Sequence, residues 1–351
     1  MIEITRPLMT LTDYAGIDVP NVSKSSSEVE AMEKASKLPD GTYYLERPNA
    51  TIVVAQGASV PVPDPIGYVF PPVGTATLTV TEDFAGGRLN TTSVLPPGDP
   101  AGNAYTLVTN PPPGAARNGT HCARFFLQRS DWAALAPLKP RAALNGNPYI
   151  NYPTGTENWF GGSMCIPSSY QMETLTNQQT ILWQISGGGQ NVAGNDVTTG
   201  TSPPCEFGES KDFPGVWSVS MATGQMGVSN TRVPIWQATD AELPRDVWLD
   251  WVIRYIMTGE DTGVCQIWLQ KDGGGYEQIV DIVNAPTSTW GRNGGSITGP
   301  YAPTFVHLNI YKANYLSNAS TVPSYVYYAD EWRMAAGTEG GRLVDPTEYE
   351  A

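Results

Sequence analysis

A long series of short, strand-like segments most limits what this sequence can fold into. From Ala76 onward, runs rich in β-branched and aromatic residues alternate with clusters of Gly, Pro, Asn and Asp. Such runs pack well in strands, and such clusters break regular structure. We expect no helix longer than two turns in this part. Many antiparallel strands without helices predict an all-β, two-sheet sandwich of the jelly-roll or concanavalin-like type. The segments are TATLTVTEDF, HCARFFLQRS, ENWFGGSMCIP, QTILWQIS, VWSVSMA, WLDWVIRYIM, GVCQIWLQKDG, PTFVHLNIYK and SYVYYADEWRM.

The composition agrees with strands and loops and limits the partners. Only 15% of the 351 residues are charged, whereas Gly (36) and Pro (30) are abundant. The net charge of −14 is spread along the chain, and no basic stripe is present. A diffuse negative field repels nucleic acid and anionic membranes, so we expect neither as a partner. An acidic polymer would bind only where a few cations converge.

The cysteines and the start of the chain bear on metals and location. Cys122, Cys165, Cys205 and Cys265 lie far apart without a CxxC pair, so a zinc site is not expected. We expect buried thiols, with one disulfide left open as an alternative. The start lacks a basic segment followed by an apolar one, and no apolar run reaches about 18 residues. This predicts no signal peptide and no membrane span, and a location on a virion or outside the cell after assembly or lysis.

The first 58 residues predict a small α/β module. Residues 1–23 read as an extended arm, and Ser25–Ser27 followed by EVEAMEKASKL predict one short helix, because a hydroxyl cap precedes an acidic first turn. Two strands follow within residues 42–55. The Pro-rich residues 59–75 predict a stiff linker, the sandwich then spans residues 76–338, and residues 339–351 form a tail. The stretch SEVEAMEKASKLPDGTYYLERPNATIVV resembles pieces of bacteriophage virion proteins, which implies an anchor.

Short motifs follow one another in a specific order in the second part. In sequence they are KPRAAL, ENWFGGS, TILWQIS, DVWLDWVIR, QIWLQKDG, FVHLNIYK and VYYADEW. This series resembles the β-jelly-roll polysaccharide lyases, the group of heparin lyase I, glucuronan lyase and alginate lyases, over residues 78–338. The resemblance implies a curved sheet whose concave face binds an acidic polysaccharide, and β-elimination at a uronic acid. That reaction needs a group that neutralises the uronate carboxylate, a base for the C5 proton and an acid for the leaving oxygen.

The resemblance transfers only in part onto this sequence. Arg141 and Gln184 match the family's residues that handle the carboxylate. Ala143 stands where the family has Glu, and Ser186 stands where it has the proton-abstracting His. Serine is a poor base without a neighbouring His, so the resemblance implies weakened elimination.

The strand-like segment FVHLNIYK supplies the remaining candidates. Tyr311 matches the family's proton-donating Tyr, and His307 stands where a Lys is common. Period-2 geometry places His307, Asn309 and Tyr311 on one face, away from the aliphatic Val306, Leu308 and Ile310. In the TILWQIS segment the same period predicts one face with Leu182, Gln184 and Ser186 and an opposite face with Ile181, Trp183 and Ile185.

These observations predict a virion-type or surface-associated protein whose sandwich binds acidic polysaccharide. Catalysis, if retained, is assigned to Tyr311, Arg141 and Gln184, and carbohydrate binding to His307, Asn309, Arg141 and Gln184. Two alternatives stay open: a purely structural capsid decoration, fibre or tail subunit, and an active phage polysaccharide lyase. A secreted bacterial lyase is disfavoured by the missing signal peptide. No cofactor is expected, although calcium at Asp330 is left open. A homo-oligomer is also left open, and so are virion partners that bind through residues 1–58.

Overall fold

The computed structural model divides the chain into two compact units, Met1–Val69 and Phe70–Ala351. In the first unit it describes the strands β1 to β7 and residues 67–69. In the second it describes residues 70–82, 105–132, 140–145, 155–176, 178–186, 204–225, 231–259, 261–290, 305–312, 315 and 320–348. Within these residues, no helix has the length and apolar character needed to cross a membrane.

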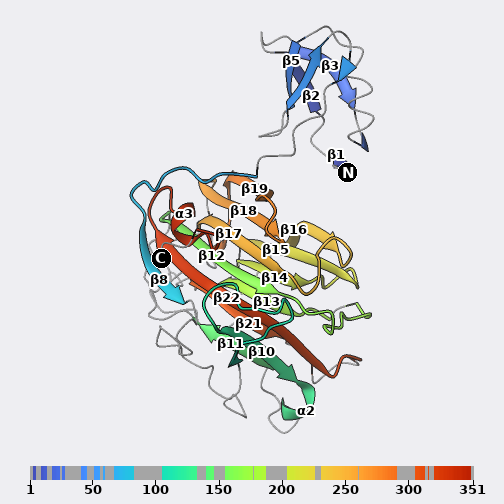
Figure 1. Ribbon diagram of the computed structural model, residues 1–351, viewed down its shortest axis with the longest axis vertical. Helices are drawn as coiled ribbons and strands as arrows, with labels where there is room; N and C mark the ends of the chain where they lie inside the picture. The colour runs from blue at the N-terminus through green and yellow to red at the C-terminus, as the bar shows by residue number, and fades with distance from the viewer. Residues whose placement is uncertain are drawn as a thin grey trace. The chain divides into compact units, whose positions relative to one another are not determined.

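The first unit contains a two-stranded and a five-stranded antiparallel sheet (Figure 1). The expected strands within residues 42–55 are present as a hairpin of β5 and β6, and the expected arm contains the paired strands β2 and β3. The expected helix over residues 25–38 lies almost wholly outside the described residues. The strands are β1 (Glu3–Ile4), β2 (Met9–Asp13), β3 (Asp18–Ser23), β4 (Ser26–Ser27), β5 (Gly41–Leu45), β6 (Thr51–Ala55) and β7 (Ala58–Ser59).

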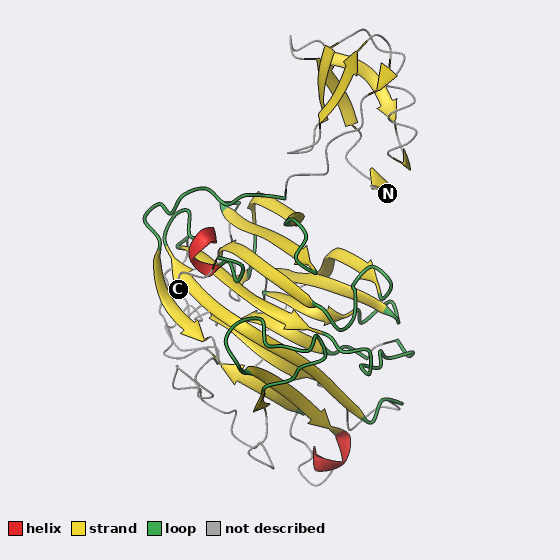
Figure 2. Ribbon diagram, in the orientation of Figure 1, coloured by secondary structure: helices red, strands yellow, loops and turns green. Residues whose placement is uncertain are grey.

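The second unit is a sandwich of two sheets, as the strand pattern predicts (Figure 2). The eight-stranded sheet has the order β19-β18-β17-β12-β22-β10-β9, and β8 also pairs with β22. Every described pair in it is antiparallel. Its strands are β8 (Thr77–Glu82), β9 (Tyr105–Val108), β10 (Cys122–Gln128), β12 (Glu157–Cys165), β17 (Trp248–Ile256), β18 (Gly263–Lys271), β19 (Glu277–Ala285) and β22 (Ser324–Ala336).

The seven-stranded sheet has the order β11-β21-β13-β14-β15-β16, and the short β20 pairs in parallel with β15. In the described part of the chain, the helices are the single turns α2 (Arg129–Trp132) and α3 (Gly341–Val344). The strands of this sheet are β11 (Arg141–Asn145), β13 (Ile181–Ser186), β14 (Cys205–Glu209), β15 (Val216–Gln225), β16 (Thr231–Thr239), β20 (Thr289–Trp290) and β21 (Phe305–Tyr311).

The hydrophobic core lies between the two sheets and is rich in aromatic rings. Trp183 and Phe207 from the seven-stranded sheet meet Trp251 from the eight-stranded sheet, with ring centroids 5.6 Å and 4.7 Å from that of Trp251. Large rings bury much apolar area and favour such tilted or edge-on contacts. The four cysteines are buried free thiols, which confirms the expectation for them.

The strict alternation expected in TILWQIS is wrong at its start. Leu182 belongs to the core cluster together with Trp183 and Ile185, whereas Ile181 does not. The register of β13 shifts between Ile181 and Trp183 against both neighbouring strands. Relative to β14, β13 has one extra residue at this irregularity, and Leu182 turns inward, but Gln184 still points away from the core as expected.

Side chains and a short segment cover part of the outer face of the eight-stranded sheet. Phe70 packs against Trp159, Trp268 and Tyr276, with ring centroids 6.4, 5.3 and 5.3 Å away. The segment containing α3 lies against β12 at Gly161, where an added Cβ would collide with the carbonyl of Val344. These contacts bury the part of this face that β12 and β18 form.

The chain just before β8 meets the chain just after β22. The backbone N–H of Ala76 donates to the carbonyl of Thr338 at 3.1 Å, and the hydroxyls of Thr75 and Thr338 lie 3.0 Å apart. Beyond Thr338, the chain stays on the sandwich, since Tyr276 donates a hydrogen bond to Asp345 at 2.8 Å. The division between the units falls inside the expected linker of residues 59–75, and the boundaries at 58, 75 and 338 stay predictions.

Candidate functional site

Three neighbouring strands bring the predicted site residues to one face of the seven-stranded sheet. Strand β21 lies between β11 and β13. Arg141 on β11 is the register partner of Tyr311, and Gln184 on β13 is the register partner of His307. Residues directly opposite in antiparallel strands have Cβ atoms about 4.5–5.5 Å apart on the same face. The side chains of these four residues therefore share a face.

That face is the one turned away from the core. Val306, Leu308 and Ile310, which alternate with the candidates along β21, are at most 8% exposed and belong to the core cluster. Successive side chains of a strand point to opposite faces. His307 and Tyr311 are only half-buried, and so are Arg141 and Gln184. We call this face the outer face of the seven-stranded sheet.

Arg141 and Tyr311 form the clearest pair on the outer face. The guanidinium carbon of Arg141 lies 5.2 Å from the centroid of the Tyr311 ring. A cation over an aromatic face is attracted by the ring quadrupole, which holds the guanidinium in place. The planar guanidinium matches the geometry of a carboxylate. The pair can therefore place a uronate carboxylate beside a phenol hydroxyl.

His307 lies farther along the same strand. Burial, together with the charge of Arg141, lowers the pKa of His307 from its ordinary value to about 3. The imidazole is therefore neutral at neutral pH and only weakly basic. His307 and Tyr311 are four residues apart on a strand, roughly 13 Å, so they do not share one proton-transfer centre.

Asn309 is more deeply buried than the other candidates on β21. Asn309 is 2% exposed, so it lies beneath the surface of the outer face. Its amide donates a long hydrogen bond of 3.5 Å to the His307 carbonyl, and its Oδ1 has no hydrogen-bond partner among the described residues. Ser186 is the register partner of Phe305 at the end of β13, and its side chain lies outside the described residues.

A buried acidic residue on the outer face was missed by the sequence reading. Glu206 on β14 is the register partner of Gln184 and is 2% exposed. It forms an ion pair with Arg232 of β16 and accepts a hydrogen bond from Gln179. Burial raises the pKa of Glu206, and the charge of Arg232 opposes that shift. Alternation in CEFGE separates Glu206 from Cys205 and Phe207, but only the pairing of β14 with β13 brings it to the site.

A buried ion pair lies next to the site on the opposite side of β21. Lys312 is fully buried, and its ammonium lies 3.2 Å from a carboxylate oxygen of Glu173 and donates to the hydroxyl of Thr180 at 3.0 Å. The same Glu173 oxygen accepts hydrogen bonds from the hydroxyls of Tyr325, at 2.8 Å, and Ser320. The cluster fixes the end of β21 that carries Tyr311.

A second carboxylate extends this cluster. Glu209, which is 2% exposed, accepts hydrogen bonds from the Tyr170 hydroxyl at 2.7 Å and the Glu173 backbone N–H at 3.2 Å. Burial raises its pKa to about 7, although the charge of Lys312 opposes the rise.

Asp330, the residue left open for calcium, binds backbone amides. Its Oδ2 accepts from the N–H groups of Arg117 and Asn118, at 2.8 and 3.3 Å, and its Oδ1 accepts from that of Glu331 at 2.9 Å. Burial raises its pKa to about 8. Among the described residues, no group of three His, Cys, Asp or Glu side chains could hold a metal ion.

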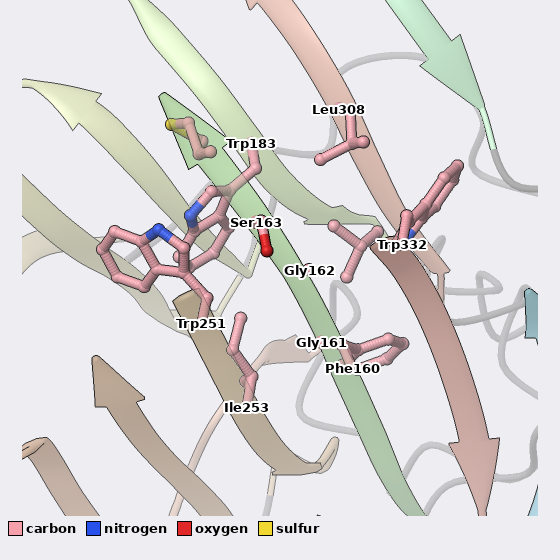
Figure 3. A pocket seen from close by; sticks show the side chains of 11 residues that line it. Phe160, Gly161, Gly162, Ser163, Trp183, Trp251, Ile253, Leu308 and Trp332 are labelled. Carbon is pink, nitrogen blue, oxygen red and sulfur yellow. The ribbon is translucent and has the colours of Figure 1, made fainter. Parts of the chain in front are cut away.

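A small cavity between the sheets is separate from the outer face (Figure 3). Its volume is about 30 Å³, and the side chains that line it are mainly apolar. The lining includes Trp183, Trp251 and Trp332, whose indole N–H groups have no hydrogen-bond partner among the described residues. Such a space holds one or two waters at most, so it is too small for a sugar.

Comparison with known proteins agrees with this architecture. A family model described as polysaccharide lyase matches residues 104–333. No curated protein matches the sequence. Among solved structures, an endo-β-1,4-glucuronan lyase from the fungus Trichoderma reesei has a TM-score of 0.51 at 14% identity, over 78% of this chain and all of that one. At this identity the likeness supports the β-sandwich fold alone.

Two marine alginate lyases are more distant. The enzyme from Aplysia kurodai has a TM-score of 0.41 at 10% identity, over 66% of this chain and 87% of that one. The enzyme from Zobellia galactanivorans has a TM-score of 0.38 at 9% identity, over 75% of this chain and 94% of that one.

Because the family model spans more than half of the sequence, the chain belongs to the polysaccharide lyase family.

Proposed function

We propose that the sandwich binds an acidic polysaccharide on the outer face of the seven-stranded sheet, and that its β-elimination activity is weak or absent. The observation that carries the proposal is the placement of Arg141, Tyr311, Gln184 and His307 on one face of three neighbouring strands. Arg141 supplies the cation that a uronate requires, and Gln184 supplies an amide for the same carboxylate or for sugar hydroxyls.

Weak elimination follows from the missing base. Serine stands at the position where a His is expected, and His307 is weakly basic because its pKa is about 3. Tyr311 beside Arg141 is then the group best placed to move a proton. Family membership supports a polysaccharide as the ligand. The relatives' substrates, glucuronan and alginate, make an acidic polymer the first choice.

The experiment combines binding with catalysis. Wild-type protein is titrated with alginate, glucuronan and heparin, and with a neutral glucan as control, while the ultraviolet absorbance of the unsaturated uronate product is followed. We expect binding to at least one acidic polymer, none to the neutral one, and weaker binding by Arg141→Gln. Rapid elimination that Tyr311→Phe abolishes would refute the proposal of weak activity and favour an active lyase.

We also propose that residues 1–58 attach the sandwich to a virion or a cell surface. The proposal is supported by the separate compactness of the first unit and by the phage-like sequence of residues 27–54. Deletion of residues 1–58 should leave polysaccharide binding intact and abolish co-sedimentation with virions or cells. If wild-type protein binds no acidic polysaccharide but still co-sediments, the purely structural role replaces the binding role.

A further inference from the structure

A second arginine reaches the outer face from the edge of the seven-stranded sheet. Arg232 lies on the terminal strand β16, two strands away from β14 in the sheet order. Its Nη1 nevertheless lies 2.6 Å from Oε1 of Glu206 on β14. The side chain therefore extends inward across β15, and 22% of it is exposed, against 2% for Glu206. Nη1 itself is buried against Glu206, but part of the Arg232 side chain is accessible to solvent, whereas the Glu206 side chain is not.

Glu206 holds this arginine next to the predicted site. Glu206, Gln184 and His307 are register partners across β14, β13 and β21, so they form one row. Gln179 donates a hydrogen bond to the oxygen of Glu206 that meets Arg232, which fixes the carboxylate. The guanidinium of Arg232 thus lies at one end of a row that includes two of the proposed binding residues.

We propose that Arg232 is a second contact for the carboxylates of the bound polysaccharide, and that Glu206 is its positioning residue. This inference rests on the function proposed above. Arg141 lies over Tyr311 on β21 and Arg232 lies beside β14, so two strand spacings and four residues along a strand separate them, roughly 16 Å on the diagonal. A chain of several uronates that crosses the face between the two arginines passes over Gln184. A single sugar reaches only one arginine.

An ion-paired arginine suits this task. The planar guanidinium has five N–H donors arranged in a fork, so it can bind one carboxylate through one edge and a second through another. The pair with Glu206 orients the side chain before the ligand arrives, which reduces the entropy lost on binding.

The test compares Arg232→Gln with Arg254→Gln in the full-length protein. Arg254 is a matched control because it pairs with Glu157 at 2.8 Å and its side chain is 29% exposed, but it lies on the eight-stranded sheet. Binding of a uronate hexasaccharide and a disaccharide, from the polymer that the wild type binds, is measured by calorimetry. We expect Arg232→Gln to weaken hexasaccharide binding by about tenfold or more, as for a lost charge-assisted hydrogen bond. The disaccharide should lose less, and Arg254→Gln should leave both affinities unchanged.

Arg232→Gln leaves the buried carboxylate of Glu206 without its cation, which destabilises the fold. The double variant Arg232→Gln/Glu206→Gln avoids this unpaired charge and so separates a loss of binding from a loss of folding. It removes both charges and should show the same tenfold loss, with a native circular-dichroism spectrum. Arg232→Lys keeps the charge without the fork and should recover part of the affinity.

Three results would overturn the inference. In the first, the double variant binds like the wild type although Arg141→Gln binds weakly, so that the proposed function stands without the second contact. In the second, Arg254→Gln loses as much affinity as Arg232→Gln, which means a general charge effect. In the third, the wild type binds no acidic polymer, so that the proposed function fails and the inference fails with it.

Discussion

Replacement of Lys312 by methionine tests the buried ion pair that fixes the end of β21. The ammonium is fully buried, with a carboxylate oxygen of Glu173 at 3.2 Å and the Thr180 hydroxyl at 3.0 Å. Hydrogen bonds to charged groups contribute about 1.5–3 kcal/mol each, and two are lost. Removal of one partner of a buried pair costs about 3–5 kcal/mol, because the other charge stays buried. We therefore expect the free energy of unfolding to fall by about 3–5 kcal/mol.

Urea unfolding, followed by tryptophan fluorescence, measures this loss. The double variant Lys312→Met/Glu173→Gln removes both charges and should recover much of it, since a buried pair is worth little against neutral groups. Arg342→Met is the matched control: its pair with Glu348 has side chains that are each 43% exposed, so we expect a change within about 1 kcal/mol. A loss below about 1 kcal/mol in Lys312→Met, or a double variant less stable than the single one, would refute this reasoning.

The remaining predictions concern His307, the β12 glycines and the thiols. The pKa of His307 in the folded protein, about 3, lies below its ordinary value of 6.5, so its contribution to folding stability is present above pH 6.5 and is lost as the pH falls toward 3. The melting temperature should therefore fall more steeply over this range in the wild type than in His307→Gln. Parallel melting curves for the two proteins would contradict the burial of His307. Gly161→Ala should destabilise the fold by about 1–3 kcal/mol, because the added Cβ collides with the Val344 carbonyl. The neighbouring Gly162→Ala should cost less, because its Cβ makes ordinary contacts of 3.5–3.6 Å. Equal urea midpoints for the two variants would refute this difference. All four cysteines are buried, and burial raises the pKa of Cys122 and Cys165 to about 12, so a thiol reagent should label none in the native protein and four in urea; rapid native labelling would show an open core.

Local patterns predicted much of the sandwich. Alternation along FVHLNIY correctly separated the aliphatic core residues from His307 and Tyr311, because a strand that is buried on one side imposes a period of two. The same rule failed at Leu182, because a bulge depends on how neighbouring strands pair and not on the residues of β13 alone. Strand alternation also could not show that Asn309 is covered.

Long-range pairing explains what the sequence could not show of the site. The order β11-β21-β13-β14 joins segments that are far apart in the chain. The resemblance to a family located Arg141, Gln184 and Tyr311, and the register then placed them on one face. Glu206 and Arg232 lie in segments without a recognisable motif, so only the folded sheet reveals their pairing.

The contact between Thr75 and Thr338 has a consequence for the architecture of larger assemblies. Because the chain enters the sandwich beside the start of its closing segment, residues 339–348, a peptide bridge from the end of that segment back to Thr75 would permit a circular permutant with new termini in a surface loop. For the same reason the whole sandwich could be inserted into a turn of a host protein without stretching that turn.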